Sequence, residues 1–272
     1  MQPGVQTCTN CGTYYPQGVP SPKPARNPNR VWLLAGIGGC LAIMLTAICL
    51  VTGIFLLSFA TVPDHDADLN PNTSGPSASS SDNTREGNSG DVLLSDNFSD
   101  ERDSTFVAAE DAYSSYLFER GEYRISVVDP QTMVWSLADG KFRSVAINVD
   151  TTFSEAEPAF AAGVVFNYQD PDNFYLFSLS SEGFYSLDVL EDNNWTTLID
   201  WTETDALAPY GSPNRVSLEV GDGQIRIVLN GERLDTMRDA TFESGNVGLA
   251  VSSFDDGNVT ARFDNFAILG GE

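Results

Sequence analysis

Aromatic and amide side chains gather in one short stretch of the C-terminal half of the chain. Trp195, Trp201 and Tyr210 lie close in sequence to Asn194 and Asp192. Exposed aromatic rings with a few polar neighbours are suited to sugars, because a ring packs on apolar carbons while the neighbours orient the hydroxyl groups. Strict alternation from Asn194 to Trp201 places Trp195 and Trp201 on one face of a strand. We predict Trp195, Trp201, Tyr210 and Asn194 as ligand-binding residues; the alternative is that the tryptophans pack in a core.

A second group of residues that could do chemistry is the cysteine pair near the N-terminus. Cys8 and Cys11, followed by Gly12, resemble one knuckle of a zinc ribbon. A structural zinc ion takes four ligands, and residues 1–30 supply two thiols and no histidine. The resemblance implies Zn²⁺ bound in trans, with a second chain or a partner completing the site. The alternatives are a remnant knuckle, a redox pair and cysteines with no metal role.

Charge is distributed unevenly along the chain. All 38 acidic residues lie at or after Asp64, whereas three of the 14 basic residues precede it, which leaves 11 beyond it. Such an acidic region repels phosphate backbones, so we expect no nucleic-acid partner. It also disfavours adhesion to anionic lipid. It is compatible with divalent cations, neutral sugars and basic protein partners.

One long segment is predicted to lie in a membrane. No charged residue occurs between Arg30 and Asp64, and residues 31–62 are almost wholly apolar. About 20 apolar residues cross a bilayer as a helix, so we expect one transmembrane helix over 31–62. Basic residues precede it and aspartates follow it, which places residues 1–30 in the cytoplasm and the C-terminal region outside the cell membrane. A cleaved signal peptide is the alternative, although its apolar core is shorter.

The regions on either side of this segment differ in character. Residues 1–30 form a proline-rich cytoplasmic tail, and residues 63–91 contain no aromatic residue and Leu69 as the one large aliphatic residue. Such a composition cannot bury enough surface to order itself, so 63–91 are expected to be a disordered polar linker. We expect one folded domain over 92–272. No cysteine follows Cys49, so this domain depends on its core and not on disulfides.

The domain has the pattern of an all-β fold. Asn230-Gly231 is the preferred pair for a two-residue hairpin, and Gly221-Asp222-Gly223 indicates another tight turn. Many short apolar runs at roughly 8–12 residue spacing are typical of a β-sandwich or jelly roll. The expected strands are 113–118, 122–128, 142–149, 160–168, 174–179, 184–190, 195–201, 215–220, 224–229, 246–251 and 259–268.

Four parts of this region carry a family signature, namely 93–98, 162–166 with 173–177, 224–235, and 245–250 with 262–266. Through them the domain resembles the concanavalin A-like jelly rolls, the superfamily that holds laminin-G-like modules, legume lectins and many glucanases. The resemblance implies that the first and last strands pair, with 96–98 beside 264–266.

The resemblance raises the question of catalysis. Glucanases of this superfamily carry acids in an E-x-D-x-x-E pattern that directs them to one face of a strand, as a retaining mechanism requires. No stretch matches, since Glu182 and Asp188 are six residues apart. The domain also contains no histidine or cysteine for a catalytic triad. We therefore expect a non-catalytic domain, and a glycoside hydrolase with an unrecognised site stays open.

If the terminal strands pair, Asp96 and Asp264 converge. Carboxylate oxygens are the ligands that Ca²⁺ prefers, so we predict a calcium site there. The alternative is that these residues are present because Asp forms good turns.

Together these patterns predict a membrane-anchored, extracytoplasmic module that recognises carbohydrate. A protein-interaction or sensory module is the alternative, with another surface protein as its partner. That alternative requires the assembly of the membrane helix to change, and so predicts a homodimer.

Overall fold

The computed structural model describes residues 84–271 with the exception of residues 86, 88 and 156. The predicted cytoplasmic tail with Cys8 and Cys11, the predicted membrane segment 31–62 and residues 63–83 of the predicted linker lie outside the described residues. Within the part of the chain that is described, no helix is long and apolar enough to cross a membrane.

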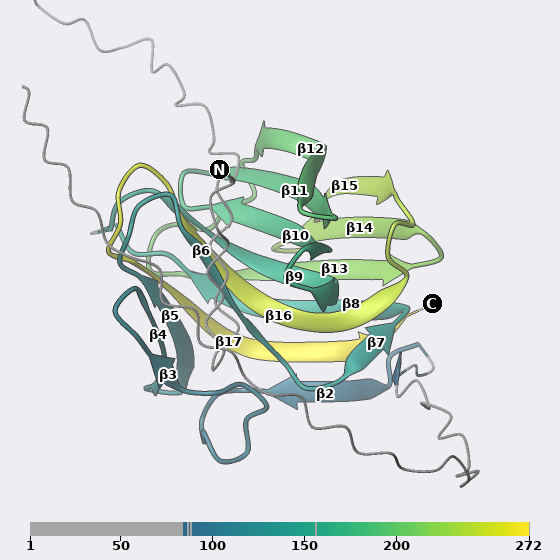
Figure 1. Ribbon diagram of the computed structural model, residues 1–272, viewed down its shortest axis with the longest axis horizontal. Helices are drawn as coiled ribbons and strands as arrows, with labels where there is room; N and C mark the ends of the chain where they lie inside the picture. The colour runs from purple at the N-terminus through teal and green to yellow at the C-terminus, as the bar shows by residue number, and fades with distance from the viewer. Residues whose placement is uncertain (1–83, 86, 88, 156, 272) are drawn as a thin grey trace, which may run out of the picture. The chain divides into compact units, whose positions relative to one another are not determined.

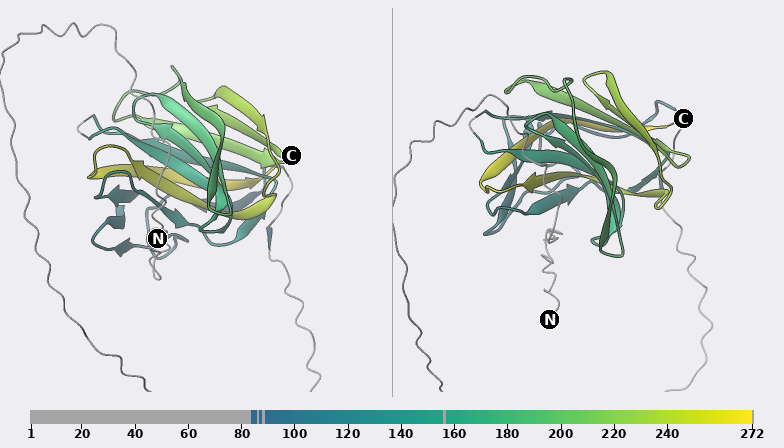
Figure 2. Two further views of the ribbon diagram at one scale, coloured as in Figure 1. Left: turned by 45° about the horizontal axis from the view of Figure 1, so that its top comes forward. Right: turned by 90° about the horizontal axis from the view of Figure 1, so that it is seen from above.

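The described chain is all-β and forms two sheets (Figure 1), which are seen as separate layers in Figure 2. In the front sheet the strand order is β1-β7-β16-β9-β10-β11-β12, and β6 also pairs with β16. Its strands are β1 (Thr84–Arg85), β6 (Met133–Leu137), β7 (Lys141–Arg143), β9 (Phe160–Asp170), β10 (Asn173–Ser180), β11 (Phe184–Glu191), β12 (Asn194–Glu203) and β16 (Ser244–Ser253).

The back sheet has the order β15-β14-β13-β8-β17-β5-β4-β3, and β2 also pairs with β17. Its strands are β2 (Val92–Asp96), β3 (Ala109–Glu110), β4 (Ser114–Glu119), β5 (Glu122–Val127), β8 (Val145–Thr152), β13 (Pro213–Gly221), β14 (Gln224–Leu229), β15 (Glu232–Arg238) and β17 (Val259–Gly270). All pairings except that of β1 with β7 are antiparallel, as an alternating apolar pattern favours.

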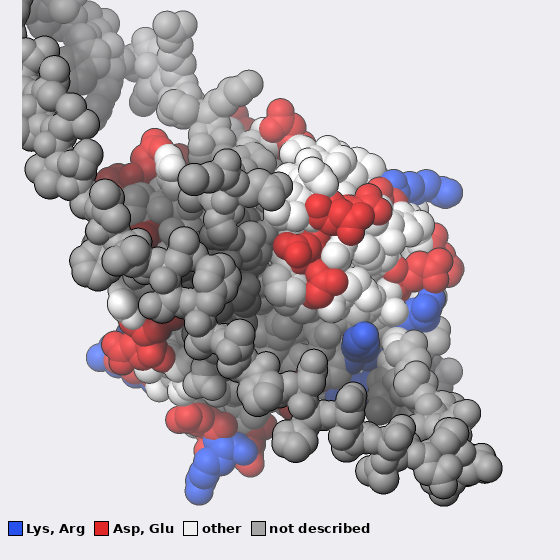
Figure 3. All heavy atoms as spheres, in the orientation of Figure 1, with Lys and Arg blue, Asp and Glu red and all other residues white. Residues whose placement is uncertain are grey.

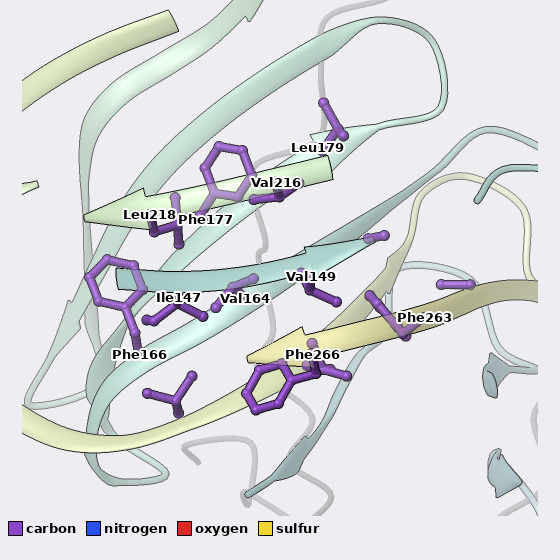
Figure 4. Packing of buried hydrophobic residues seen from close by; sticks show 14 of the residues in the cluster. Ile147, Val149, Val164, Phe166, Phe177, Leu179, Val216, Leu218, Phe263 and Phe266 are labelled. Atoms are coloured by element: carbon purple, nitrogen blue, oxygen red, sulfur yellow. The ribbon is translucent and has the colours of Figure 1, made fainter. Parts of the chain in front are cut away.

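The main core lies between the two sheets. Alternate residues of each strand face inward, so Val164 and Phe166 of β9 meet Ile147 and Val149 of β8 (Figure 4). Phe177 of β10 lies in the same cluster with no exposed surface. Removing this apolar area from water is the main force that holds the sheets together.

The ends of the described domain pair as expected. Asp96 of β2 lies opposite Phe266 of β17, and Ser95 lies opposite Ala267. Directly after β2, Phe98 stacks on Tyr123 with ring centroids 5.4 Å apart. The pairing of the first and last long strands is therefore confirmed.

One predicted strand is wrong. The range 142–149 is split between β7 of the front sheet and β8 of the back sheet. Ser144 lies between them with a φ of 49°, a left-handed conformation that interrupts an extended strand. The chain therefore passes from one sheet to the other at Ser144.

The predicted hairpin turn at Asn230-Gly231 is confirmed, with φ values of 51° and 83° in the link between β14 and β15. We expect Gly231→Ala to lower the free energy of unfolding by about 1–2 kcal/mol, because an L-residue is strained in this left-handed conformation. A β-carbon at Gly231 would meet no atom within 4 Å, so backbone strain is the whole effect. Gly231→Asn is the control and should lose less, since Asn tolerates this conformation. Equal losses in urea unfolding of both variants would contradict the prediction.

Candidate functional site

Four aromatic side chains form a cluster on the outer face of the front sheet, away from the main core. Trp135 of β6 lies 5.4 Å from Phe174 of β10 and 6.2 Å from Tyr168 of β9, measured between ring centroids. Phe174 lies 5.8 Å from Tyr168 and 5.7 Å from Trp195 of β12. We call these four residues the outer aromatic cluster. It belongs to a separate apolar group whose members come from front-sheet strands alone, which places it on the face opposite the core.

The register of the strands explains how this cluster forms. Phe174 lies opposite Leu190 of β11, which in turn lies opposite Trp195 of β12. These side chains therefore share one face. Phe174 is fully buried, whereas Tyr168 and Trp195 are partly exposed on either side of it. Phe174 thus supports two rings that solvent reaches, in a stacked contact with Tyr168 and an edge contact with Trp195.

The surroundings of Tyr168 raise the pKa of its hydroxyl group. Burial, followed by the negative charge of Asp170, raises the pKa of its hydroxyl to about 12, and a hydrogen bond with Trp135 opposes this rise. The hydroxyl therefore stays protonated at neutral pH and is available as a neutral polar group.

Two turns form a polar rim beside Tyr168 and Trp195. The backbone N–H of Asp192 donates to Oδ1 of Asn173 at 3.0 Å, and that of Asn193 donates to the carbonyl oxygen of Asp172 at 3.1 Å. The side-chain amide of Asn194 donates to the carbonyl oxygen of Asp192 at 2.8 Å. The predicted ligand residue Asn194 therefore lies in this rim, next to Trp195.

A buried carboxylate lies on the same face as the cluster. Oδ1 of Asp188 accepts from the hydroxyl of Thr197 at 2.6 Å, and Oδ2 accepts from Ser186 at 3.1 Å. Burial raises the pKa of the Asp188 carboxyl group, and the hydrogen bonds from Thr197 and Ser186 offset part of that rise. Among the described residues, no lysine or arginine pairs with it.

This carboxylate gives a pH-dependent stability. Because its pKa is raised in the folded state, its charge destabilises the fold as pH rises above the unfolded value of about 3.9. We expect Asp188→Asn to be more stable than the original protein at neutral pH, since Asn keeps the acceptor for Thr197 without the buried charge. The difference should vanish as pH falls below the unfolded value, in urea unfolding measured over a pH series. A constant difference at every pH would contradict it.

The residues around Asp188 match the glucanase pattern in part, which the strict pattern does not detect. Residues 186–191 read Ser-Leu-Asp-Val-Leu-Glu, which has the acids of the second and third positions of E-x-D-x-x-E and a serine at the first. Ser186 and Asp188 both lie on β11, two residues apart, and so share one face. Glu191 is exposed at the end of the strand. A pattern that allows a non-acidic residue at the first position matches residues 186–191.

The remaining predicted ligand residues lie apart from the outer aromatic cluster. The strict alternation predicted along β12 is wrong, because two irregularities of register interrupt its pairing with β11. Trp195 therefore joins the outer face, whereas Ile199 joins the main core. Trp201 packs edge-on against Phe254 at 5.9 Å. Tyr210 lies in the loop after β12 with 49% of its surface exposed.

The two predicted calcium ligands, Asp96 and Asp264, accept hydrogen bonds from different groups. Oδ1 of Asp96 accepts from the backbone N–H of Phe98 at 2.8 Å, and its Oδ2 accepts from Ser104. Asp264 accepts from the backbone N–H of Asn265. A shallow pocket of about 450 Å³ is lined by Asp96 but not by Asp264. No group of three or more His, Cys, Asp or Glu side chains within the described residues is placed to hold a metal, so calcium here stays a prediction.

The fold resembles those of solved structures. The carbohydrate-binding module CBM66 from Bacillus subtilis matches with 14% identity and a TM-score of 0.50, over 61% of this chain and 96% of that one. A galectin-like protein of unknown function from Bacillus subtilis has 15% identity, a TM-score of 0.49 and coverage of 67% and 97%. The β-glucanase of Bacillus licheniformis has 9% identity, a TM-score of 0.49 and coverage of 66% and 98%. No protein-family model and no curated protein matches the sequence.

At such low identity these likenesses establish the fold alone. The described domain is an all-β, two-sheet sandwich of the concanavalin A-like type, as the sequence resemblance implied. This fold hosts both carbohydrate-binding modules and glycoside hydrolases, so function has to be argued from the site.

Proposed function

We propose that this domain is a non-catalytic carbohydrate-binding module whose ligand lies against Tyr168 and Trp195. The observation that carries the proposal is the pair of partly exposed rings fixed on either side of buried Phe174. A rigid aromatic pair of this kind offers large contact area with little conformational entropy to lose on binding. Asn194 and Thr197 supply polar groups next to Trp195. The likeness to a carbohydrate-binding module supports the proposal as an analogy of fold.

The arrangement of acids supports binding over hydrolysis. Retaining hydrolysis needs two carboxyl groups about 5–5.5 Å apart across the scissile bond. The strand that presents Asp188 carries Ser186 where the glucanase pattern has its first acid. A glycoside hydrolase is the second candidate, and the raised pKa of Asp188 is the observation that favours it, because a general acid must hold its proton.

The experiment is glycan-array binding of the full chain in detergent, with calcium and then with a chelator. The bound glycans are then incubated with the protein and their products separated by chromatography. Selective binding without cleavage supports the proposal, and cleavage that is lost in Asp188→Asn supports the hydrolase. An array with no binding, from protein shown to be folded, overturns both and favours a protein partner.

We also propose that the module is held outside the cell membrane by residues 31–62, with residues 1–30 in the cytoplasm. The uncharged apolar run and the basic residues before it support this orientation. No cysteine follows Cys49, so a cysteine placed by Ser89→Cys reports on the outer region alone. A membrane-impermeant thiol reagent should label that variant in intact cells and leave the original chain unlabelled. Labelling of the original chain would overturn the orientation.

A further inference from the structure

Some of the hydrogen-bond donors around the outer aromatic cluster are used within the protein. The side-chain amide of Asn194 donates to the carbonyl oxygen of Asp192, and that of Asn173 donates to Oδ1 of Asp170 at 2.9 Å. The amide of Gln169 donates to the carbonyl oxygens of Asn167 and Ser244. A side-chain amide has two N–H donors, so Gln169 uses both within the protein, whereas Asn194 and Asn173 use one each.

The hydroxyl of Thr197 also donates its proton within the protein. Its proton is donated to buried Asp188 at 2.6 Å, and a carboxylate can only accept. Thr197 is itself exposed on β12, two residues from Trp195. The lone pairs of its oxygen remain as acceptors, and Asp188 acts as a positioning residue that fixes the orientation of the hydroxyl.

Several acceptors are left for a ligand. They are the Oδ1 atom of Asn194, the hydroxyl oxygen of Thr197 and the exposed carboxylates of Asp170, Glu191 and Asp192. The donors on this face are neutral groups, namely the hydroxyl of Tyr168, the indole N–H of Trp195 and the second amide N–H of Asn173 and of Asn194.

The surrounding charge has the same sign over a long stretch. Residues 144–214, which include β9 to β12, contain 12 acidic residues and no lysine or arginine. In Figure 3, acidic side chains are spread over the visible face, its upper part included, whereas basic side chains are seen at its edges and lower down. The potential at the outer aromatic cluster is therefore negative, and cations are also attracted to aromatic faces.

We propose that the ligand is a carbohydrate bearing free, protonated amino groups. An ammonium group has three donors and no acceptor, so it complements a face that offers acceptors, negative charge and aromatic rings. The inference rests on the proposed function and specifies the class of sugar.

The test compares three sets of oligosaccharides that share length and linkage and differ at one carbon. They carry a free amine (glucosamine), an acetylated amine (N-acetylglucosamine) or a hydroxyl (glucose) at that carbon. Binding to the full chain in detergent is measured by calorimetry, at a pH below the pKa of the sugar amine. The glucosamine oligomer should bind at least about tenfold more tightly than the other two, as expected for hydrogen bonds to charged groups.

A second experiment removes charge from the polar rim by substitutions that keep the shape of the side chains. Asp170→Asn with Asp192→Asn should lower the preference for the amine several-fold, while Asn retains the acceptors. Glu110→Gln with Glu232→Gln removes the same charge from exposed positions of the back sheet and should leave the preference unchanged. Equal losses in both pairs would indicate attraction to the whole acidic surface and overturn the inference.

The outcomes separate the two proposals. Tight binding of the glucose or acetylated oligomer, equal to that of the amine, overturns the inference and leaves the proposed function standing. Failure of all three oligomers, together with an empty glycan array, overturns the proposed function and the inference with it.

Discussion

Phe177→Ala is expected to lower the free energy of unfolding by about 3–5 kcal/mol. Phe177 has no exposed surface and lies in the middle of β10, opposite Val164 of β9 and Leu187 of β11. Its truncation loses the transfer free energy of a phenyl ring and leaves a cavity between the two sheets, because the surrounding strands cannot collapse around it. The domain has no disulfide that could offset this loss of stability, since no cysteine follows Cys49.

The measurement is denaturant unfolding of residues 82–272, which hold both sheets and both apolar groups. Leu117→Ala is the control, because Leu117 is 42% exposed on β4 and its truncation should change stability by less than about 0.5 kcal/mol. The slope of the unfolding curve should be unchanged in both variants. A loss below about 1 kcal/mol for Phe177→Ala would mean that the two sheets are not packed as described.

Local chemistry made much of this fold predictable. The pair Asn230-Gly231 requires left-handed backbone at two positions, which few residues tolerate, and the structure has that turn. Alternation in 215–220 and 224–229 corresponds to β13 and β14, whose inward residues enter the main core. The pairing of β2 with β17 followed from the family resemblance and not from any local pattern.

Elements without a clear local pattern were missed or divided. β6 is short, with its first three residues all buried, so no alternation identifies it. β15 is a largely polar edge strand, and its sequence differs little from that of a loop. The passage between sheets at Ser144 depends on one residue with a left-handed backbone. A serine in the sequence does not indicate that conformation.

The candidate site was predictable only in part, because pairing within the sheet brings its residues together. Trp195 and Asn194 were identified from their own neighbourhood in sequence. Trp135 was not, since β6 joins the site through its pairing with β16, which lies far along the chain. Tyr168 and Phe174 lie on β9 and β10, which are consecutive with β11 and β12, but no spacing in the sequence shows that Phe174 contacts Trp195 across β11. The irregular register of β12 shows the same limit, because a bulge changes which residues share a face.

Trp195→Ala is expected to weaken binding of the preferred glycan by roughly 30-fold or more, about 2 kcal/mol, the loss typical of an aromatic residue central to an interface. The ring is partly exposed and is held edge-on by Phe174 at 5.7 Å, so it would contact the proposed ligand without having to be ordered first. Trp195→Phe should recover most of the affinity, because a smaller ring still packs against Phe174 and the sugar. Binding is measured by calorimetry on the full chain in detergent.

Two comparisons assign this loss to the site and not to unfolding. Tyr210→Ala removes an exposed ring that lies outside the outer aromatic cluster and should leave affinity unchanged. The stability of Trp195→Ala should fall only modestly, since Trp195 lies on the edge strand β12 and outside the main core. If Trp195→Ala binds normally while Tyr210→Ala does not, the ligand lies on the loop after β12, and the outer face of the front sheet is not the binding surface.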